Sequence, residues 1–389
     1  MRSVLDQDHG DWELVISDNC SHEDVEGYVR SLGEERIVYS RSEQPLAVTD
    51  NWNRALALCS GEYVVMLGDD DALLGGYMRR MAELIERFSE PDVVYTKALL
   101  FTYPGVDPER PDGFLMDHGC AEFFAGASDA FVLDRGRALG VVRDTMSFRM
   151  RFDFNAQFAL VSRRLIDSLA EFGAFYQSDF PDYYSMNAAF LRAQRIVIDP
   201  APRVVIGVTP KSYGYYHLND REDQGRDLLG AAGPSAATGT NINVGWLSAA
   251  EALERGPAGA EGMRVDHRRY RLVQAAYVYR RHRSGAGRDE ELTRLERELP
   301  PLERVAYRVA SRALALVHRA LPLRARLRLI GLAHRLLGQI PAVDPSLHER
   351  SYRDILEVCA ARPPPSRAAA RPAVGEQRGE LLRERAQQQ

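Results

Sequence analysis

A short apolar segment that runs into three consecutive carboxylates constrains this chain more than any other feature. Residues 63–67 are hydrophobic and predict a buried strand of a parallel sheet. Asp69, Asp70 and Asp71 follow after a single glycine. Ligands of open α/β sheets bind beyond the carboxyl ends of the strands, and adjacent acids repel one another unless a cation is near. The triplet therefore predicts either a site for Mg²⁺ or Mn²⁺ or a solvated acidic turn before the next helix.

The residues before the triplet alternate between strand and helix patterns. An apolar segment over residues 12–16 predicts a strand that ends near Asp18, and Ser21 with Asp24 resembles a helix capping box. From Trp52 to Cys59, apolar residues recur at helical spacing. The order strand, helix, strand, helix, strand indicates an α/β fold with a mostly parallel sheet flanked by helices.

Composition excludes several classes of protein. The chain has 389 residues, a formal net charge of −5, 45% hydrophobic residues and 27% charged residues, which is ordinary for a soluble protein and indicates no nucleic-acid partner. Its four cysteines contain no CxxC pair and fit neither a disulfide framework nor a zinc site. No signal peptide and no apolar stretch of transmembrane length is visible, so we expect a cytoplasmic protein.

Five motifs in order resemble the family 2 glycosyltransferases. They are Ser3–Gln7, Asp11–Leu14, Ser17–Ser21, Asn51–Leu56, and Gly61–Tyr63 leading into the triplet. The resemblance implies a glycosyltransferase A-type sheet that binds a nucleotide-diphosphate sugar. It also implies inverting, metal-dependent transfer to a hydroxyl acceptor, either lipid-linked or a saccharide, in the synthesis of cell-surface polysaccharide or glycoconjugates.

The resemblance assigns the donor site to four residues. Asp18 matches the acid that faces the nucleobase, and its alternative role is helix capping. Asp69 matches the acid that faces the ribose. Asn53 and Arg54 fall in the nucleotide-sugar motif, although Arg54 is equally compatible with a solvated helix position.

Three further residues are candidates for the metal. Asp70 matches the acid that meets Mg²⁺ or Mn²⁺, and Asp71 is either a second ligand or the N-cap of the next helix. His217 follows the last strand, where related folds place another ligand, but a histidine in a tyrosine-rich loop is more often only a loop residue. Gly68 stands where the family often has Asp, a variant of the same motif.

The family places its general base at the start of a helix below the acceptor. Asp182 is the better positional match and Asp179 is the second candidate. Either acid is also favoured at a helix N-terminus by the helix dipole alone.

The same patterns divide the chain into four parts. Residues 1–215 form the catalytic domain, 216–243 a flexible loop or lid, 244–362 a helical Arg-rich region and 363–389 a disordered tail. In the helical region, Arg304, Arg308 and Arg312 share one face and Val305, with Val309 and Leu316, another. This pattern indicates either peripheral contact with an anionic membrane or apolar faces that pack on the catalytic domain.

Two other functions compete with glycosyl transfer. A sugar-phosphate nucleotidyltransferase would carry a glycine-rich phosphate loop after its first strand, and the sequence has none. A non-catalytic binding module is the other alternative, because the first strand of the family has no counterpart here. We expect that strand about 20 or more residues upstream of Met1, and we expect the 389-residue form to be poorly stable and weakly active.

Overall fold

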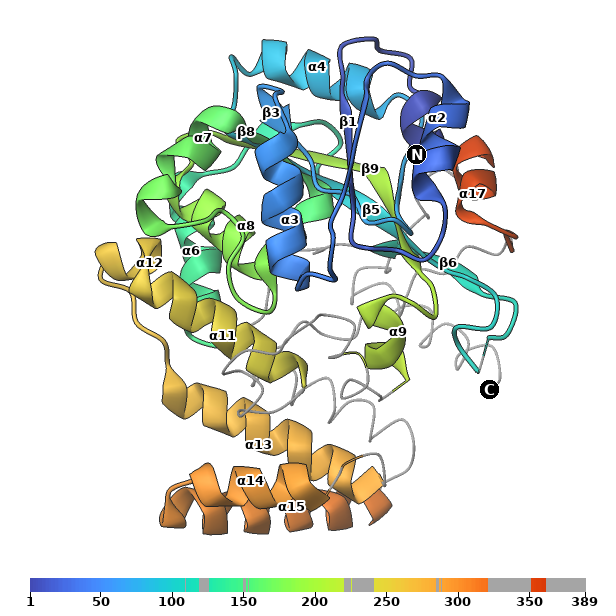
Figure 1. Cartoon of the computed structure of the whole chain (residues 1–389). Helices are drawn as coiled ribbons and strands as arrows, with labels where there is room; N and C mark the ends of the chain where they lie inside the picture. Colours follow the sequence, from blue (N-terminus) through green and yellow to red (C-terminus); the bar gives the residue numbers. More distant parts are fainter. Residues whose placement is uncertain are drawn as a thin grey trace, which may run out of the picture.

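The computed structural model describes residues 1–108, 110–118, 126–149, 152, 154–219, 225, 241–284, 287, 289–320 and 351–361. Strands gather in the upper part of the molecule with helices around them, and a group of helices extends below (Figure 1). The predicted α/β class and the helical C-terminal region are therefore confirmed.

The N-terminal part alternates strands and helices as predicted. Its elements are α1 (Arg2–Leu5), β1 (Leu14–Asp18), α2 (Val25–Leu32), β2 (Ile37–Arg41), α3 (Val48–Leu58) and β3 (Tyr63–Val64). The N-cap of α2 is Asp24, whose carboxylate accepts from the Gly27 N–H at 2.8 Å, so the capping box predicted from Ser21 does not form. Strands β1 and β2 pair in parallel as a separate two-stranded sheet.

A seven-stranded sheet forms the centre of the molecule. Its strands are β3, β4 (Ala72–Leu73), β5 (Val93–Thr102), β6 (Phe114–His118), β7 (Phe131–Val132), β8 (Ala159–Ser162) and β9 (Ile196–Val208). The main order is β3-β8-β5-β9-β4. Among the described strands of this sheet, only β5 and β9 pair in parallel. Strand β8 enters between β3 and β5 in the opposite direction, and β4, β6 and β7 also pair antiparallel to their neighbours. The expected mostly parallel sheet is therefore mixed, and the strand predicted over 63–67 is shorter and antiparallel to β8.

Helices cover this sheet and supply the core. They are α4 (Tyr77–Arg87), α6 (Arg135–Met146), α7 (Arg163–Ser168), α8 (Pro181–Arg192), and the 3₁₀ helices η1 (Ala156–Phe158) and η2 (Ala170–Phe172). Rings from β5, η1 and α8 meet around Tyr95, which lies 5.8 Å from Phe158 and 5.7 Å from Phe190 between ring centroids. Pro181 occupies the first turn of α8, where its missing N–H leaves no intrahelical bond unmade.

Further helices follow the last strand. They are α9 (Tyr213–Leu218), α11 (Ile242–Arg255), α12 (Pro257–Ala260), α13 (His267–Ser284), α14 (Asp289–Glu298), α15 (Pro301–Ala320) and α17 (Ile355–Ala361). Ala249 and Leu253 of α11 belong to the main core with α8, and α17 packs beside β4. Most of the predicted loop at 216–243, residues 321–350 and the predicted tail lie outside the described residues. None of the described helices is long and apolar enough to cross a membrane.

Candidate functional site

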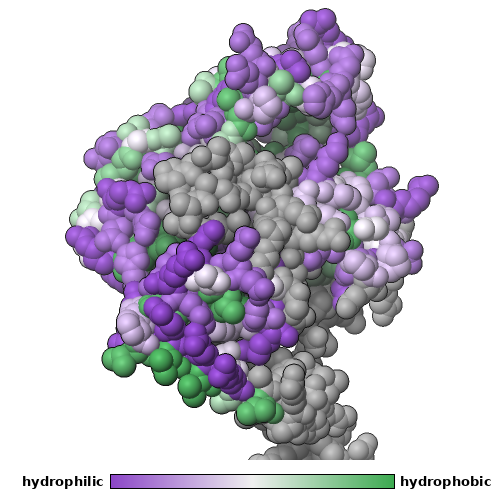
Figure 2. Space-filling view, turned by 60° about the horizontal axis from the view of Figure 1, so that its bottom comes forward, coloured by the Kyte–Doolittle hydropathy of each residue, from purple (hydrophilic) through white to green (hydrophobic). Residues whose placement is uncertain are grey.

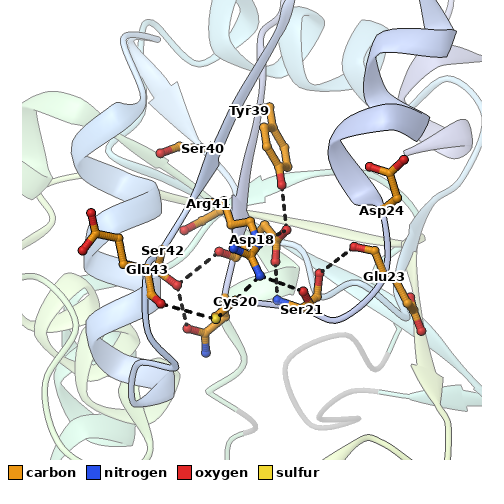
Figure 3. Close-up of polar contacts among 12 residues, drawn as sticks. Asp18, Cys20, Ser21, Glu23, Asp24, Tyr39, Ser40, Arg41, Ser42 and Glu43 are labelled. Carbon is orange, nitrogen blue, oxygen red and sulfur yellow. Dashed lines mark hydrogen bonds and ion pairs between the residues drawn. The ribbon is translucent and has the colours of Figure 1, made fainter.

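Asp18 occupies the carboxyl end of β1 and is buried there. Its carboxylate accepts hydrogen bonds from the Tyr39 hydroxyl at 2.7 Å and from the Ser21 N–H at 2.8 Å, and Arg41 Nε lies 3.6 Å away (Figure 3). Burial opposes ionisation, but the hydrogen bonds from Tyr39 and Ser21 and the charge of Arg41 outweigh it and lower the pKa of Asp18. The same bond raises the pKa of Tyr39 to about 12. Asp18 is therefore held as a carboxylate at the predicted position.

Arg54 reaches from α3 to the ends of β1 and β2. Its guanidinium donates to the Ser17 hydroxyl at 2.6 Å and to the Ser40 carbonyl at 3.2 Å, and it also contacts the Ser40 hydroxyl. These bonds rule out the alternative of a merely solvated helix residue. They place a fixed positive charge one residue before Asp18.

Asn53 makes a different kind of contact. Its side-chain nitrogen donates to the Tyr176 carbonyl at 2.8 Å, and its side-chain oxygen accepts from the Tyr176 N–H at 3.1 Å. Thr49, one turn earlier, donates to the Ser178 carbonyl at 2.6 Å. Helix α3 therefore holds the backbone that precedes α8, and the amide of Asn53 is engaged with protein. Its predicted role at the nucleotide sugar stays a prediction.

Asp71 fastens the acidic triplet to β9. One of its carboxylate oxygens accepts from the Gly207 N–H at 3.0 Å and the other from the Gly68 N–H at 2.9 Å. A Cβ at residue 68 would lie 2.7 Å from that second oxygen, which explains the glycine where the family often has Asp. A Cβ at residue 207 would lie 1.9 Å from the Asp70 carbonyl oxygen. Asp71 does not cap the next helix, whose N-cap is Gly76.

Asp70 and Asp69 are more open than Asp71. Asp69 is exposed and Asp70 is half-buried. Burial raises the pKa of Asp70 to about 6, and the charge of Asp69 adds to the shift, while a hydrogen bond with Ser212 opposes it. Burial and the charge of Asp70 raise the pKa of Asp71 to about 7. The triplet therefore concentrates negative charge that the protein neutralises only in part.

The segment after β9 joins the two acid-bearing strand ends. Ser212 hydrogen bonds with Asp70, and the ammonium of Lys211 lies 3.3 Å from the Glu23 carboxylate, in the turn that follows Asp18. The predicted ligand His217 is exposed on α9. Within the described ranges, no group of three or more His, Cys, Asp or Glu side chains is arranged to hold a metal ion. The structure therefore does not assemble His217 with Asp70 and Asp71 as a ready-made metal site.

The two base candidates lie where the backbone turns into α8. Asp182 is the second residue of the helix, is half-buried, and accepts from the Tyr183 N–H at 2.8 Å. Asp179 precedes the helix and is also half-buried. The Phe180 ring lies 5.5 Å from the ring of Tyr213, one residue after the Ser212 that contacts Asp70. The aromatic contact links this segment to the acidic triplet.

Sequence reasoning missed the residues that join these segments. No sequence motif marks Tyr39, Lys211 or Ser212. Tyr39 lies 21 positions from its partner Asp18, and Lys211 lies 188 positions from its partner Glu23, so only the fold brings them together. Only the glycine at 207 offered a signal, since glycine inside a strand often marks a close backbone approach. Two surface cavities of about 590 and 570 Å³ contain none of the predicted site residues and take no part in the site.

Comparison with known proteins identifies the N-terminal part of the chain. Residues 1–120 match the family described as Glycosyl transferase family 2. This range includes β1 to β6, with Asp18, Arg54 and the acidic triplet. This part of the chain is therefore similar to glycosyl transferase family 2.

Individual relatives match over short stretches. The chain is 37% identical over 73 residues to the putative colanic acid biosynthesis glycosyl transferase WcaA of Escherichia coli, covering 18% of this chain and 26% of the relative. It is 33% identical over 86 residues to the GalNAc(5)-diNAcBac-PP-undecaprenol beta-1,3-glucosyltransferase of Campylobacter jejuni, covering 21% and 28%. The chain thus spans about a quarter of the length of these relatives.

A solved structure resembles a larger part of the chain at low similarity. S. aureus TarS 1-349 in complex with UDP-GlcNAc superposes with a TM-score of 0.42 and 14% identity, covering 76% of this chain and 85% of TarS 1-349.

Proposed function

We propose that this protein is an inverting glycosyltransferase that moves a sugar from a nucleotide-diphosphate sugar to a hydroxyl acceptor. The observation that carries the proposal is Asp70, half-buried beside Asp69, with a pKa raised to about 6 and linked through the segment after β9 to the turn of Asp18. The family match over residues 1–120 and the names of the relatives support this activity. The acceptor is a saccharide or a lipid-linked sugar, and the product serves cell-surface polysaccharide or glycoconjugate synthesis.

The donor set of the triplet fits a divalent cation that takes most of its ligands from substrate and water. Both oxygens of Asp71 already accept backbone N–H groups, so Asp70 is the better ligand and Asp69 its neighbour. Mg²⁺ or Mn²⁺ typically binds one or two carboxylates together with substrate phosphates. Such an ion would neutralise the negative charge of the departing diphosphate.

The remaining residues take roles in binding and proton transfer. Asp18 accepts from the edge of the nucleobase, and Arg54 keeps the ends of β1 and β2 in place beneath it. Asp182 accepts the proton of the acceptor hydroxyl. The freed oxygen attacks the anomeric carbon opposite the diphosphate, the bond from that carbon to the phosphate oxygen breaks, and the configuration inverts.

The first test uses a panel of nucleotide-diphosphate sugars with Mn²⁺ or Mg²⁺. We expect release of a nucleoside diphosphate from at least one donor, and more release when the correct acceptor is added. Formation of a nucleoside triphosphate and a sugar 1-phosphate after pyrophosphate is added to the donor would indicate a nucleotidyltransferase. Binding of a donor without any turnover, with or without saccharide acceptors, would indicate a non-catalytic module.

The second test separates the two base candidates. Asp182→Asn should lower kcat about 100-fold and leave the nucleotide Kd nearly unchanged, because proton removal matters only in the transition state. Asp179→Asn, the matched control three residues earlier, should be mild. If the control is the crippling change, Asp179 is the base.

We extend the proposal to the place of action. An enzyme that uses nucleotide sugars and lipid-linked acceptors works on the cytoplasmic side of a membrane, in peripheral contact with it.

A further inference from the structure

Helix α15 exposes its apolar side, which an ordinary surface helix buries. Its apolar residues Leu302, Val305, Val309 and Leu316 are 86%, 62%, 61% and 67% exposed. We call these four residues the α15 stripe. An amphipathic helix of a globular protein normally turns this side to the core. Figure 2 shows hydrophobic surface gathered at the lower edge of the helical end, beside charged side chains.

The polar side of the same helix faces the protein. Glu303 accepts two hydrogen bonds from Arg271 of α13, at 2.8 and 2.9 Å. Arg308 pairs with Glu296 of α14 at 2.6 Å, and Ser311 contacts Arg283 of α13. Residues 303, 307 and 311 recur every four positions, so they lie on one face, opposite the α15 stripe. These ion pairs fix which side of the helix remains outside.

The dimensions of the α15 stripe argue against a second copy of the chain. From Leu302 to Leu316 the stripe is about 21 Å long, and it is no wider than one helix, about 10 Å. Such an area is far below the roughly 800 Å² per partner that a stable protein interface buries. Among the described residues, the other exposed large apolar side chains, such as Val132 on β7, lie on separate elements and do not extend it.

The charge of Arg312 favours a lipid surface over a second copy of the chain as the binding partner of the stripe. Apolar residues at 302, 305, 309 and 316 follow the three-four spacing of a helix seam, and the remaining seam position is the exposed Arg312. A self-associated seam would desolvate this guanidinium, at a cost that a lipid surface avoids. At a bilayer, an arginine on an interfacial helix extends its head to anionic headgroups while the apolar residues enter the acyl boundary.

We propose that the α15 stripe is a membrane-docking surface for anionic lipid, with Arg312 as its headgroup contact. The ion pairs of α13 and α14 present the stripe as a preformed ridge, so docking requires no unfolding of the helix. The inference does not rest on the proposed glycosyl transfer, since lipid binding and nucleotide-sugar turnover are measured separately.

The test is co-sedimentation of the full chain with vesicles. One set contains phosphatidylglycerol and phosphatidylcholine in equal amounts, and the other contains phosphatidylcholine alone. We expect binding to the anionic vesicles at low salt and weaker binding to the neutral ones. The double variant Val305→Gln/Val309→Gln should bind at least about tenfold more weakly, and Arg312→Gln about fivefold more weakly with less sensitivity to salt. Val132→Gln and Arg30→Gln, which change an exposed apolar residue and an exposed arginine elsewhere, should bind as the unchanged chain does.

Thermal unfolding and sedimentation velocity test the other occupants. A stripe that faces lipid is bare in water, so the double variant should keep its melting temperature and its oligomeric state. A lower melting temperature would mean that another part of the chain covers the stripe, and a dimer that the variant dissociates would mean a second copy. Either result, or no binding to anionic vesicles at low salt, would overturn the proposal.

Discussion

The turn that carries Asp18 and the turn that carries the acidic triplet both follow strands and both contain acids. The surrounding residues lower the pKa of the acid in the first turn and raise the pKa of acids in the second. Asp18 is surrounded by donors, and its pKa is lowered by Tyr39, Ser21 and Arg41 against the effect of burial. Burial raises the pKa of both Asp70 and Asp71, and the charge of Asp69 adds to the rise at Asp70, as the charge of Asp70 does at Asp71. A carboxylate satisfied by the protein is ready to orient a neutral ligand, whereas carboxylates that lack compensation attract a cation.

The largest effect should come from Asp70→Asn, which removes charge and preserves shape. We expect kcat to fall about 1,000-fold, because the variant would no longer hold the cation that neutralises the negative charge of the leaving diphosphate in the transition state. The measurement is nucleoside diphosphate release over a range of Mn²⁺ concentrations. If the variant and the unchanged protein respond equally to Mn²⁺, the triplet does not hold the cation. Asp129→Asn, an exposed acid that pairs with Arg87, serves as the control.

Gly207→Ala should disturb the triplet through the backbone. The new Cβ would fall 1.9 Å from the Asp70 carbonyl oxygen, so β9 and the turn must separate and the bond from Gly207 to Asp71 must lengthen. We expect a loss of about 2–3 kcal/mol in the free energy of unfolding, measured with urea. Gly140→Ala is the matched control, because its Cβ would have no neighbour within 4 Å. Equal stability of the two variants would show that the triplet is not fastened as described.

The two turns should give opposite pH dependence to stability in the absence of divalent cations. Folding raises the pKa of Asp70 and Asp71 from 3.8 to about 6 and 7. Their contribution to the free energy of unfolding is therefore fully present below about pH 4 and is lost as the pH rises to 7. The contribution of Asp18, whose pKa is lowered, is present above pH 3.8 and is lost as the pH falls below it. Urea unfolding between pH 3 and 8, about the range both groups span, measures the two terms.

Asp70→Asn should flatten the decline between about pH 4 and 7, and added Mg²⁺ should reduce that decline in the unchanged protein. A decline that is identical in the variant would assign the effect to other groups.

The smallest effect should come from Tyr39→Phe, which removes one donor from Asp18 and leaves the ring. This change should lower the stability least of the changes described here, because the hydrogen bond from the Ser21 N–H to Asp18 remains. We expect the pKa of Asp18 to rise, as followed by carboxyl NMR. Tyr28→Phe on the exposed face of α2 is the control. An unchanged Asp18 pKa would show that Arg41 and Ser21 suffice.

Local sequence patterns predicted individual helices and strands but did not predict which strands pair with one another. The helix start at Pro181, the helix over 48–58 and the strand that ends at Asp18 follow from proline, apolar spacing and strand propensity within a few residues. The antiparallel entry of β8 beside β3 depends on a return of the chain after about a hundred residues, which no local pattern encodes. The hairpin strand β6 also has no clear local signal, because the segment before it is rich in glycine and proline, which favour a loop.

The candidate site shows the same limit. The acids themselves were identified from the sequence, but their charge states depend on Tyr39, Gly207 and Ser212, which only the fold brings near. The exposed apolar side of α15 was also beyond prediction, since amphipathic spacing does not say which side faces the protein.

The amide of Asn53 has a consequence for how variants of this chain behave. It holds the backbone N–H and carbonyl of Tyr176 by two bonds, and Thr49 holds Ser178, so α3 is fixed to the segment between the 3₁₀ helix Ala170–Phe172 and α8, which carries Asp179. A change at Asn53 should then act at a distance, by loosening the backbone at the start of α8, where the proposed base Asp182 lies. Its kinetic signature would be a poorer response to acceptor at an unchanged donor affinity, although the residue sits in the motif assigned to the donor.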